Sequence, residues 1–161
     1  MHQEINKSYH QILEEIGFSF IHPYQVAGMG EPWSMKLNST LELLQEHNIG
    51  AILTLMENNL YYHQYCEAGF LSHHESVDDC MPPTAEAMDR AIEFIDHSLS
   101  KGLGVAVHCF EGRGRTATVL AAWIGKKESL DPQRAIERVY KARPHSIITK
   151  EQRAFLCNYI K

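Results

Sequence analysis

Apolar positions along the chain form short continuous runs in the first part and helically spaced stripes in the second. The short runs predict strands, at residues 18–21, 25–27, 51–56, 70–74 and 104–108. Pro23 separates the first two, because proline cannot donate to a ladder. The run 51–56 is apolar throughout, which is typical of a central strand covered on both faces.

The stripes with helical spacing predict helices, at residues 39–47, 84–100, 116–126, from 132 onward and from 150 onward. Thr84 is a candidate N-cap, Asp131 precedes a proline at the first helical position, and Thr149 with Gln152 forms a capping box. Residues 57–68 fit a loop or a short helix, whereas Pro82-Pro83 makes 77–83 a loop. The pattern predicts an α/β fold with a central, mostly parallel sheet flanked by helices.

The composition narrows the class of protein. A length of 161 residues, 44% of them hydrophobic, predicts one globular domain over residues 1–161. The net charge of −5 argues against a nucleic-acid partner, since such proteins usually carry a basic surplus. The polar start at residues 1–7 argues against a secretory signal, and the most apolar run, 117–125, is too short to span a bilayer.

Four scattered cysteines, with no Cys-x-x-Cys pair, argue against a disulfide scaffold or a structural zinc site. They are Cys66, Cys80, Cys109 and Cys157. Adjacent His73 and His74 point to opposite faces of a strand and make a poor chelating pair. We therefore expect a soluble protein of a reducing compartment, without a metal or another cofactor.

The candidate chemistry lies in the segment between the last predicted strand and the long apolar helix. It contains, in order, His108, Cys109, Phe110, Glu111, Gly112, Arg113, Gly114, Arg115 and Thr116. A helix N-terminus with nearby cations stabilises a thiolate, the nucleophilic form of cysteine. The glycines permit a curled loop whose amides hold phosphate oxygens. Arg115 offers a planar fork for two phosphoryl oxygens, and Thr116 places a hydroxyl near the sulfur.

With these residues the sequence resembles the protein tyrosine phosphatase superfamily, whose signature is His-Cys-x5-Arg-Ser/Thr. More narrowly it resembles the small atypical dual-specificity phosphatases of the VH1-like member Z type. The likeness runs from about Phe18 to Tyr159 and includes segments outside the loop. These are Val26-Ala27-Gly28, Asp79 to Pro83, Arg143-Pro144-x-Ser146-Ile147 and Glu151-Gln152.

The resemblance implies a single-domain cysteine-phosphatase fold and a metal-independent phosphocysteine mechanism. Cys109 attacks phosphorus, residues 110–115 bind the phosphate with Arg115 as its principal ligand, and an aspartate protonates the leaving oxygen. That aspartate is Asp79, three residues before Pro82-Pro83, with Asp78 as the alternative. The same resemblance implies phosphotyrosine, phosphoserine and phosphothreonine in proteins as substrates.

Several other residues have candidate roles outside the central mechanism. His108 orients the surroundings of the cysteine, and Gln152 either places the hydrolytic water or serves only the capping box. Arg143 fits a structural role better than a catalytic one. Cys80 lies beside the acid and is a candidate for a reversible disulfide with Cys109. Tyr61, Tyr62 and Tyr65 form a substrate rim or, as the preferred interpretation, a partly buried aromatic patch.

Two departures and several alternatives bear on these expectations. Ala117 stands where the family usually has glycine, and Glu111 puts an acid in the loop, which weakens a polyanionic-lipid substrate. A structural strand-to-helix turn, a catalytically dead phosphoprotein reader and a sulfur-transfer enzyme are disfavoured, because cysteine, arginine and acid are all present. We expect a cytoplasmic monomer, also nuclear if eukaryotic, that acts on phosphorylated proteins and binds neither nucleic acid nor membrane.

Overall fold

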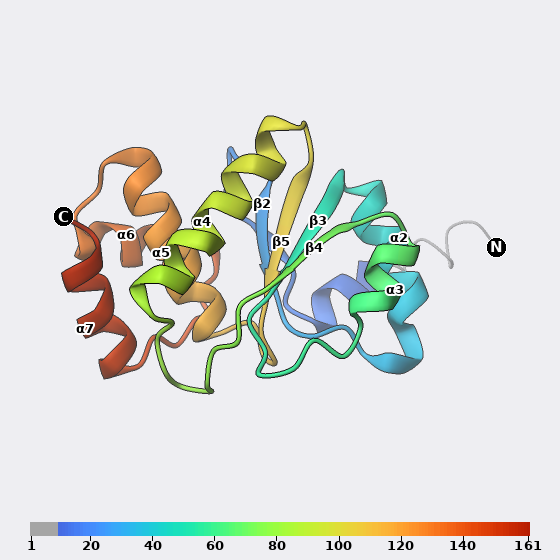
Figure 1. Ribbon diagram of the computed structural model, residues 1–161, viewed down its shortest axis with the longest axis horizontal. Helices are drawn as coiled ribbons and strands as arrows, with labels where there is room; N and C mark the ends of the chain where they lie inside the picture. The colour runs from blue at the N-terminus through green and yellow to red at the C-terminus, as the bar shows by residue number, and fades with distance from the viewer. Residues whose placement is uncertain (1–9) are drawn as a thin grey trace.

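Five strands form one mixed sheet in the computed structural model, which describes residues 10–161. The polar segment 1–7 lies outside these residues. The strands are β1 (Ser19–Phe20), β2 (Val26–Met29), β3 (Ile49–Thr54), β4 (Leu71–His74) and β5 (Gly104–His108). Their order is β1-β2-β5-β3-β4, and only β1 runs antiparallel to its neighbour. The predicted mostly parallel sheet is confirmed, with β5 at its centre (Figure 1).

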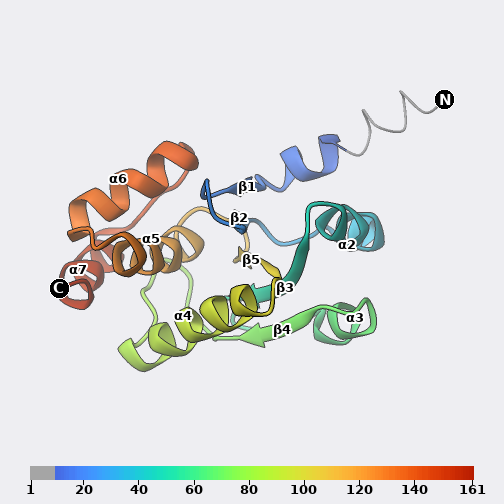
Figure 2. The same ribbon diagram turned by 90° about the horizontal axis from the view of Figure 1, so that it is seen from above.

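Helices cover both faces of this sheet, as Figure 2 shows from above. They are the 3₁₀ helix η1 (Ser34–Lys36) and α2 (Leu37–Glu46), α3 (Tyr62–Glu67), α4 (Ala85–Ser100), α5 (Arg115–Glu128), α6 (Pro132–Ala142) and α7 (Lys150–Tyr159). One core cluster joins the sheet to α4, α5, α6 and α7. A second joins its other face to α2 and α3. The family of folds expected from the sequence, an α/β sheet between helical layers, is therefore the one observed.

Local sequence explains where the helices begin. The side chains of Thr84, Asp131 and Thr149 each accept a hydrogen bond from a backbone N–H in the first turn of α4, α6 and α7. Residues 57–68, ambiguous in sequence, contain the six-residue α3. Strand β3 ends at Thr54, two residues earlier than the apolar run suggests. Beyond Thr54, the N–H of Leu55 still donates to the carbonyl of His108, whereas its own carbonyl faces the guanidinium of Arg115 at 3.5 Å.

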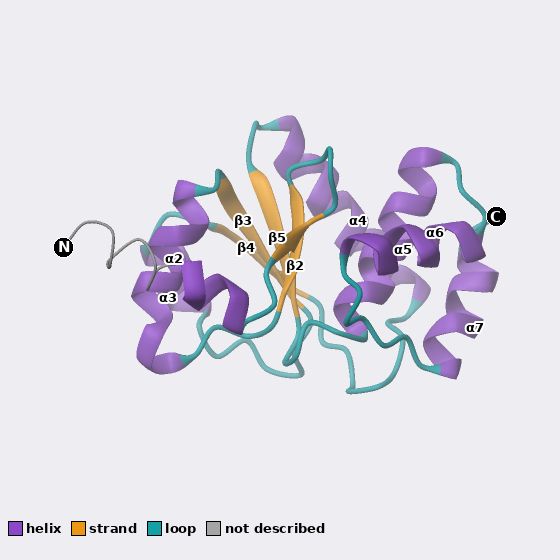
Figure 3. Cartoon of the chain, turned by 180° about the vertical axis from the view of Figure 1, so that it is seen from behind, coloured by secondary structure: helices purple, strands orange, loops and turns teal. Residues whose placement is uncertain are grey.

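The carboxyl ends of the four parallel strands meet at one edge of the sheet, where the loops gather in Figure 3. Ligand sites of α/β sheets lie at this edge. The loop after β5 leads directly into α5, whose first eleven residues, Arg115–Gly125, are all buried. Burial of that helix fixes the position of the loop before it. Within residues 10–161 we find no helix with the length and apolar character needed to cross a bilayer.

Candidate active site

The loop of residues 109–114 curls so that its peptide carbonyls face outward. Four of these oxygens accept hydrogen bonds from groups outside the loop, namely those of Phe110, Gly112, Arg113 and Gly114. The C=O and N–H of a trans peptide point in opposite directions, so the N–H groups turn toward the inside of the loop. Within residues 10–161, no protein group accepts a hydrogen bond from the amides of 110–114. The loop is thus a ring of inward amide donors, which is the geometry of an anion-binding nest.

The two glycines of the loop are needed for different reasons. Gly112 has φ of +72°, and a Cβ there would lie 2.5 Å from the carbonyl of Met29. Only glycine fits such a conformation and such a close approach. Gly114 has an ordinary φ of −99°, so its place in the loop does not depend on an unusual backbone angle. Its small size matters instead, because a Cβ would meet the carbonyl of Ile147 at 3.1 Å.

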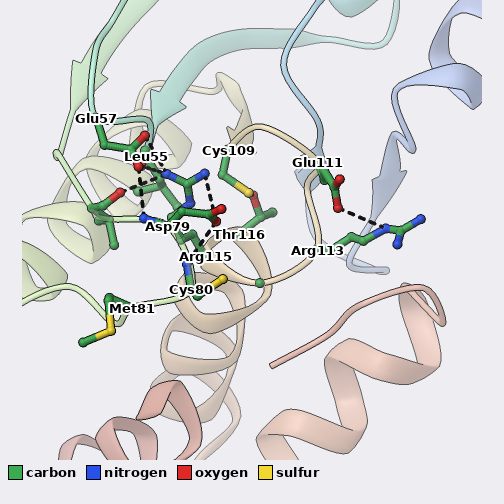
Figure 4. Close-up of polar contacts among 12 residues, drawn as sticks. Leu55, Glu57, Asp79, Cys80, Met81, Cys109, Glu111, Arg113, Arg115 and Thr116 are labelled. Atoms are coloured by element: carbon green, nitrogen blue, oxygen red, sulfur yellow. Dashed lines mark hydrogen bonds and ion pairs between the residues drawn. The ribbon is translucent and has the colours of Figure 1, made fainter. Parts of the chain in front are cut away.

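The thiol of Cys109 lies at the floor of the loop and is 3% exposed. The hydroxyl of Thr116 donates to its sulfur at 3.1 Å, as Figure 4 shows. The sulfur also lies near the N-terminus of α5, whose dipole favours negative charge. A hydroxyl donor and a helix N-terminus are the surroundings in which reactive cysteines are found.

The guanidinium of Arg115 is 3% exposed and is held from three sides. Its Nη1 donates to the carboxylate of Glu57 at 3.0 Å and to the carbonyl of Val77 at 2.9 Å. Its Nη2 lies 3.4 Å from Oδ1 of Asp79. These contacts fix the plane of the guanidinium at the mouth of the loop (Figure 4), where it can bind two oxygens of a phosphoryl group.

Glu57 is a positioning residue that the sequence analysis missed. One carboxylate oxygen accepts from Arg115, and the other accepts from the backbone N–H of Asp79 at 3.0 Å. The pKa of Glu57 is lowered, first by its own backbone N–H and then by Arg115. This side chain therefore connects the phosphate ligand to the loop that carries the predicted acid. Its place directly after a central strand was the one signal available in the sequence.

Asp79 and Asp78 differ in where they lie. A cavity of about 260 Å³ contains Asp79, Cys109 and Arg115 in its lining, and Asp78 is absent from that lining. Asp79 is exposed, and its Oδ1 also accepts from the backbone N–H of Cys80. The carbonyl of Asp78 accepts from the N–H of Met81, which closes a tight turn. The geometry brings Asp79, rather than Asp78, to the thiol and the guanidinium.

The loop of the predicted acid is tied to helix α7. Thr149 donates to the carbonyl of Cys80 at 2.8 Å, and Nε2 of Gln152 donates to the carbonyl of Met81 at 3.1 Å. The predicted capping box is present, because Oε1 of Gln152 accepts from the N–H of Thr149. Gln152 is fully buried, so both ends of its amide are engaged in structure. Its predicted contact with a hydrolytic water stays a prediction.

Cys80 lines the same cavity as Cys109 and has a positive φ of 65°. The two residues named as candidates for a reversible disulfide thus line one cavity, and the link itself remains a prediction. Of the three tyrosines considered for a rim, Tyr65 is fully buried and Tyr62 is 45% exposed. Within residues 10–161, no group of three His, Cys, Asp or Glu side chains forms a candidate metal site.

His108 lies beneath the loop with both ring nitrogens in hydrogen-bonding range of protein groups. Nε2 is 2.9 Å from Oγ1 of Thr54, and Nδ1 is 3.2 Å from the carbonyl of Cys109. Burial lowers the pKa of His108 to about 4, with smaller contributions from the carbonyl of Cys109, which raises it, and from Arg115. The imidazole is therefore neutral at physiological pH, and its predicted role in orienting the cysteine stays a prediction that the contact with the carbonyl of Cys109 supports.

Because its folded pKa lies below the ordinary value of 6.5, His108 couples folding to pH. The unfolded chain binds the proton more readily, so stability is complete above pH 6.5 and is lost as the pH falls toward 4. Between pH 7 and pH 4.5 this loss amounts to about 2–3 kcal/mol. Urea unfolding at pH 7 and at pH 4.5 measures this effect. Between these two pH values, the free energy of unfolding of His108→Gln should fall by about 2–3 kcal/mol less than that of the wild-type protein. His63→Gln, which removes an exposed histidine, serves as control, and an equal change in both variants would contradict the assignment.

Arg143 is fully buried behind the loop. Its guanidinium donates to the carbonyls of Gly17, Gly28 and Gly112 at 2.7–2.8 Å. Burial lowers its pKa to about 10, and negative charge on Cys109 opposes that shift, so it stays cationic at neutral pH. Gly28 is required here, because a Cβ would lie 2.7 Å from Nε of Arg143. The contacts agree with the expected structural role, since they hold the carbonyl of Gly112 outward.

Comparisons with known proteins agree with this geometry. A family model described as a DSP-PTPase phosphatase of polymorphic toxin systems matches residues 27–128. An uncharacterized protein of Methanocaldococcus jannaschii is 36% identical over 85 residues, which are 53% of this chain and 56% of that protein. The rat phosphatidylglycerophosphatase and protein-tyrosine phosphatase 1 is 35% identical over 86 residues, 53% of this chain and 45% of that protein. The chain thus matches about half the length of these relatives.

A crystal structure of PTPMT1 in complex with PI(5)P superposes with a TM-score of 0.78. It is 26% identical and covers 89% of this chain and 94% of that one. The likeness extends over the sheet and both helical layers.

Proposed function

The chain belongs to the DSP-PTPase phosphatase family, and from this we propose that it hydrolyses phosphomonoesters of proteins through a phosphocysteine intermediate. Phosphotyrosine is the first substrate, and phosphoserine and phosphothreonine are further ones. One observation carries the proposal: a buried thiol, a fixed guanidinium and a carboxylate line a single cavity beside inward-turned amides. The chemistry needs these three groups together.

In the first step the thiolate of Cys109 attacks phosphorus. An S–P bond forms, and the bond from phosphorus to the ester oxygen breaks. Asp79 in its acid form gives its proton to that oxygen, so the leaving group departs as a neutral alcohol or phenol. The loop amides and Arg115 hold the three remaining oxygens as charge develops on them. The contact from Thr116 to the sulfur supports the thiolate before attack and as it leaves later.

In the second step water attacks the phosphocysteine. Asp79, now ionised, takes a proton from this water as the P–O bond forms and the S–P bond breaks. Phosphate leaves the loop and the thiolate is restored. Glu57 supports both steps indirectly, because it holds Arg115 and the backbone of Asp79 in one geometry.

A lipid phosphatase is the second candidate function. The similarity to PTPMT1, whose structure contains PI(5)P, favours it. Against it stand the exposed carboxylate of Glu111 in the loop, which repels additional phosphates, and its partial neutralisation of Arg113 at 3.9 Å. We therefore rank phosphorylated proteins first as partners and lipids second. A monomeric, cytoplasmic form completes the proposal.

A panel of substrates distinguishes the two candidates. We expect a phosphotyrosine peptide to be hydrolysed with a kcat/KM at least about tenfold above that of PI(5)P or phosphatidylglycerophosphate vesicles, in reducing buffer. Phosphoserine and phosphothreonine peptides should follow more slowly, because an alcohol is a poorer leaving group than a phenol. Release of inorganic phosphate gives the measurement. A reversed order would make the lipid phosphatase the better account.

A further inference from the structure

A second cavity, of about 580 Å³, adjoins the one that contains the thiol. The two share Phe110, Glu111 and Arg113, so the outer side of the phosphate-binding loop forms a common wall. We call the second cavity the side groove; its remaining lining residues are Glu15, Glu31, Pro32, Trp33, Ser34, Met35 and Tyr61. A substrate whose phosphate binds the loop can therefore reach this groove.

The side groove is attached rigidly to the loop. The backbone N–H of Glu31 donates to the carbonyl of Phe110 at 2.9 Å, directly beside the cysteine. Glu31 follows β2, whose parallel pairing with β5 places Met29 opposite His108. The relative position of loop and groove is thus set by the sheet. A substrate side chain bound in the groove would therefore affect catalysis by fixing the position of the substrate phosphate in the loop.

Exposed aromatic and apolar side chains line this groove. Trp33 is 56% exposed, Phe110 62% and Met35 96%. Large side chains that remain exposed together, next to a catalytic pocket, mark a contact surface for a ligand. Nζ of Lys36 lies 5.3 Å from the ring centroid of Trp33, so one cation already contacts this ring and an incoming cation must use its other face.

The charges in the groove leave one carboxylate free. Glu15 pairs with Lys36 at 2.7 Å, and Glu111 lies 3.9 Å from Arg113. The carboxylate of Glu31 makes no hydrogen bond or ion pair with any residue from 10 to 161, although it is half-buried. Burial raises the pKa of Glu31, and Arg115 opposes this shift. A half-buried carboxylate without a partner is complementary to an incoming cation.

We propose that the side groove binds a lysine or arginine side chain of the substrate, close in sequence to the phosphorylated residue. This inference rests on the proposed function, because it specifies which phosphopeptides the same site selects. The cation stacks on Trp33 and donates to Glu31, while its aliphatic part covers the apolar wall. A second phosphate at this place would instead meet Glu31 and Glu111, two negative charges.

A positional scan tests the proposal. Phosphotyrosine peptides that are otherwise neutral carry one arginine at successive positions on either side of the phosphotyrosine, and each kcat/KM is divided by that of the alanine peptide. We expect a ratio of about five or more at one or two positions. The ratio at these positions should fall toward one in Glu31→Gln and in Trp33→Leu. It should persist in Glu93→Gln, which removes an exposed carboxylate on α4, outside the groove.

The outcomes separate this inference from the function on which it rests. Peptides that are all hydrolysed with ratios near one, or a preference that survives both Glu31→Gln and Trp33→Leu, would overturn the groove assignment alone. Faster hydrolysis of PI(5)P vesicles than of every arginine peptide would instead count against the proposed function. If no phosphopeptide is hydrolysed, the proposed function fails. The groove can still be tested in that case, by measuring the binding affinity of the wild-type chain for the same series of peptides.

Discussion

Cys109→Ser is expected to reduce phosphate release by at least about 10⁴-fold, to the background of the assay. A serine hydroxyl ionises far less readily than a thiol, so the loop cannot supply the anionic nucleophile and attack on phosphorus nearly stops. The loop amides and Arg115 remain in place, because they are held by Glu57, Arg143 and the burial of α5. The variant should therefore still bind phosphopeptide.

The measurement combines a phosphate-release assay with a binding isotherm for the same phosphopeptide. Cys157→Ser, at an exposed position on α7, serves as the matched control and should keep wild-type turnover. Full turnover by Cys109→Ser would contradict the account, because the nucleophile would then have to lie outside this loop. Loss of both binding and folding, seen by circular dichroism, would instead assign Cys109 to the core.

Asp79→Asn should lower kcat for a phosphoserine peptide by about 10²–10⁴-fold. An alkoxide is a poor leaving group, so expulsion depends on the proton that the carboxylic acid supplies. The deficit in the first step should shrink for p-nitrophenyl phosphate, whose phenolate leaves without a full proton. Pre-steady-state kinetics with both substrates measures this dependence on the leaving group.

Asp78→Asn is the matched control one residue away. Its side chain lies outside the cavity that holds Cys109 and Arg115, so we expect a change in kcat within about twofold. The opposite ranking of the two variants would transfer the acid role to Asp78. Equal losses for both substrates in Asp79→Asn would point to a positioning role beside Arg115, at 3.4 Å, in place of proton transfer.

Much of the site was predictable because its parts are local in sequence. The order of strand, cysteine, glycines, arginine and helix fixes a loop at the carboxyl end of β5, and the structure has this arrangement. Thr116, seven positions after Cys109, contacts the sulfur for the same reason. The caps at Thr84, Asp131 and Thr149 follow from the same short-range rules.

Contacts between distant segments were not predictable from those rules. Glu57 reaches Arg115 across 58 positions only because β3 lies beside β5. The order of strands in a sheet cannot be predicted from local sequence patterns. The side groove depends likewise on β2 lying on the other side of β5. The close approach of Ile147 to Gly114 was likewise not predictable, because Ile147 comes from a remote segment. The family resemblance, rather than periodicity, supplied Asp79 as the acid, and the cavity geometry now supports that choice.

The phosphocysteine is the central claim, and direct trapping tests it. A phosphopeptide labelled with ³²P is mixed with enzyme, turnover is stopped by denaturant within milliseconds, and the labelled protein is digested for mass spectrometry. We predict label on the peptide that contains Cys109, and none in Cys109→Ser. Undiminished turnover with label on another residue, or with no labelled protein at any time point, would contradict the mechanism.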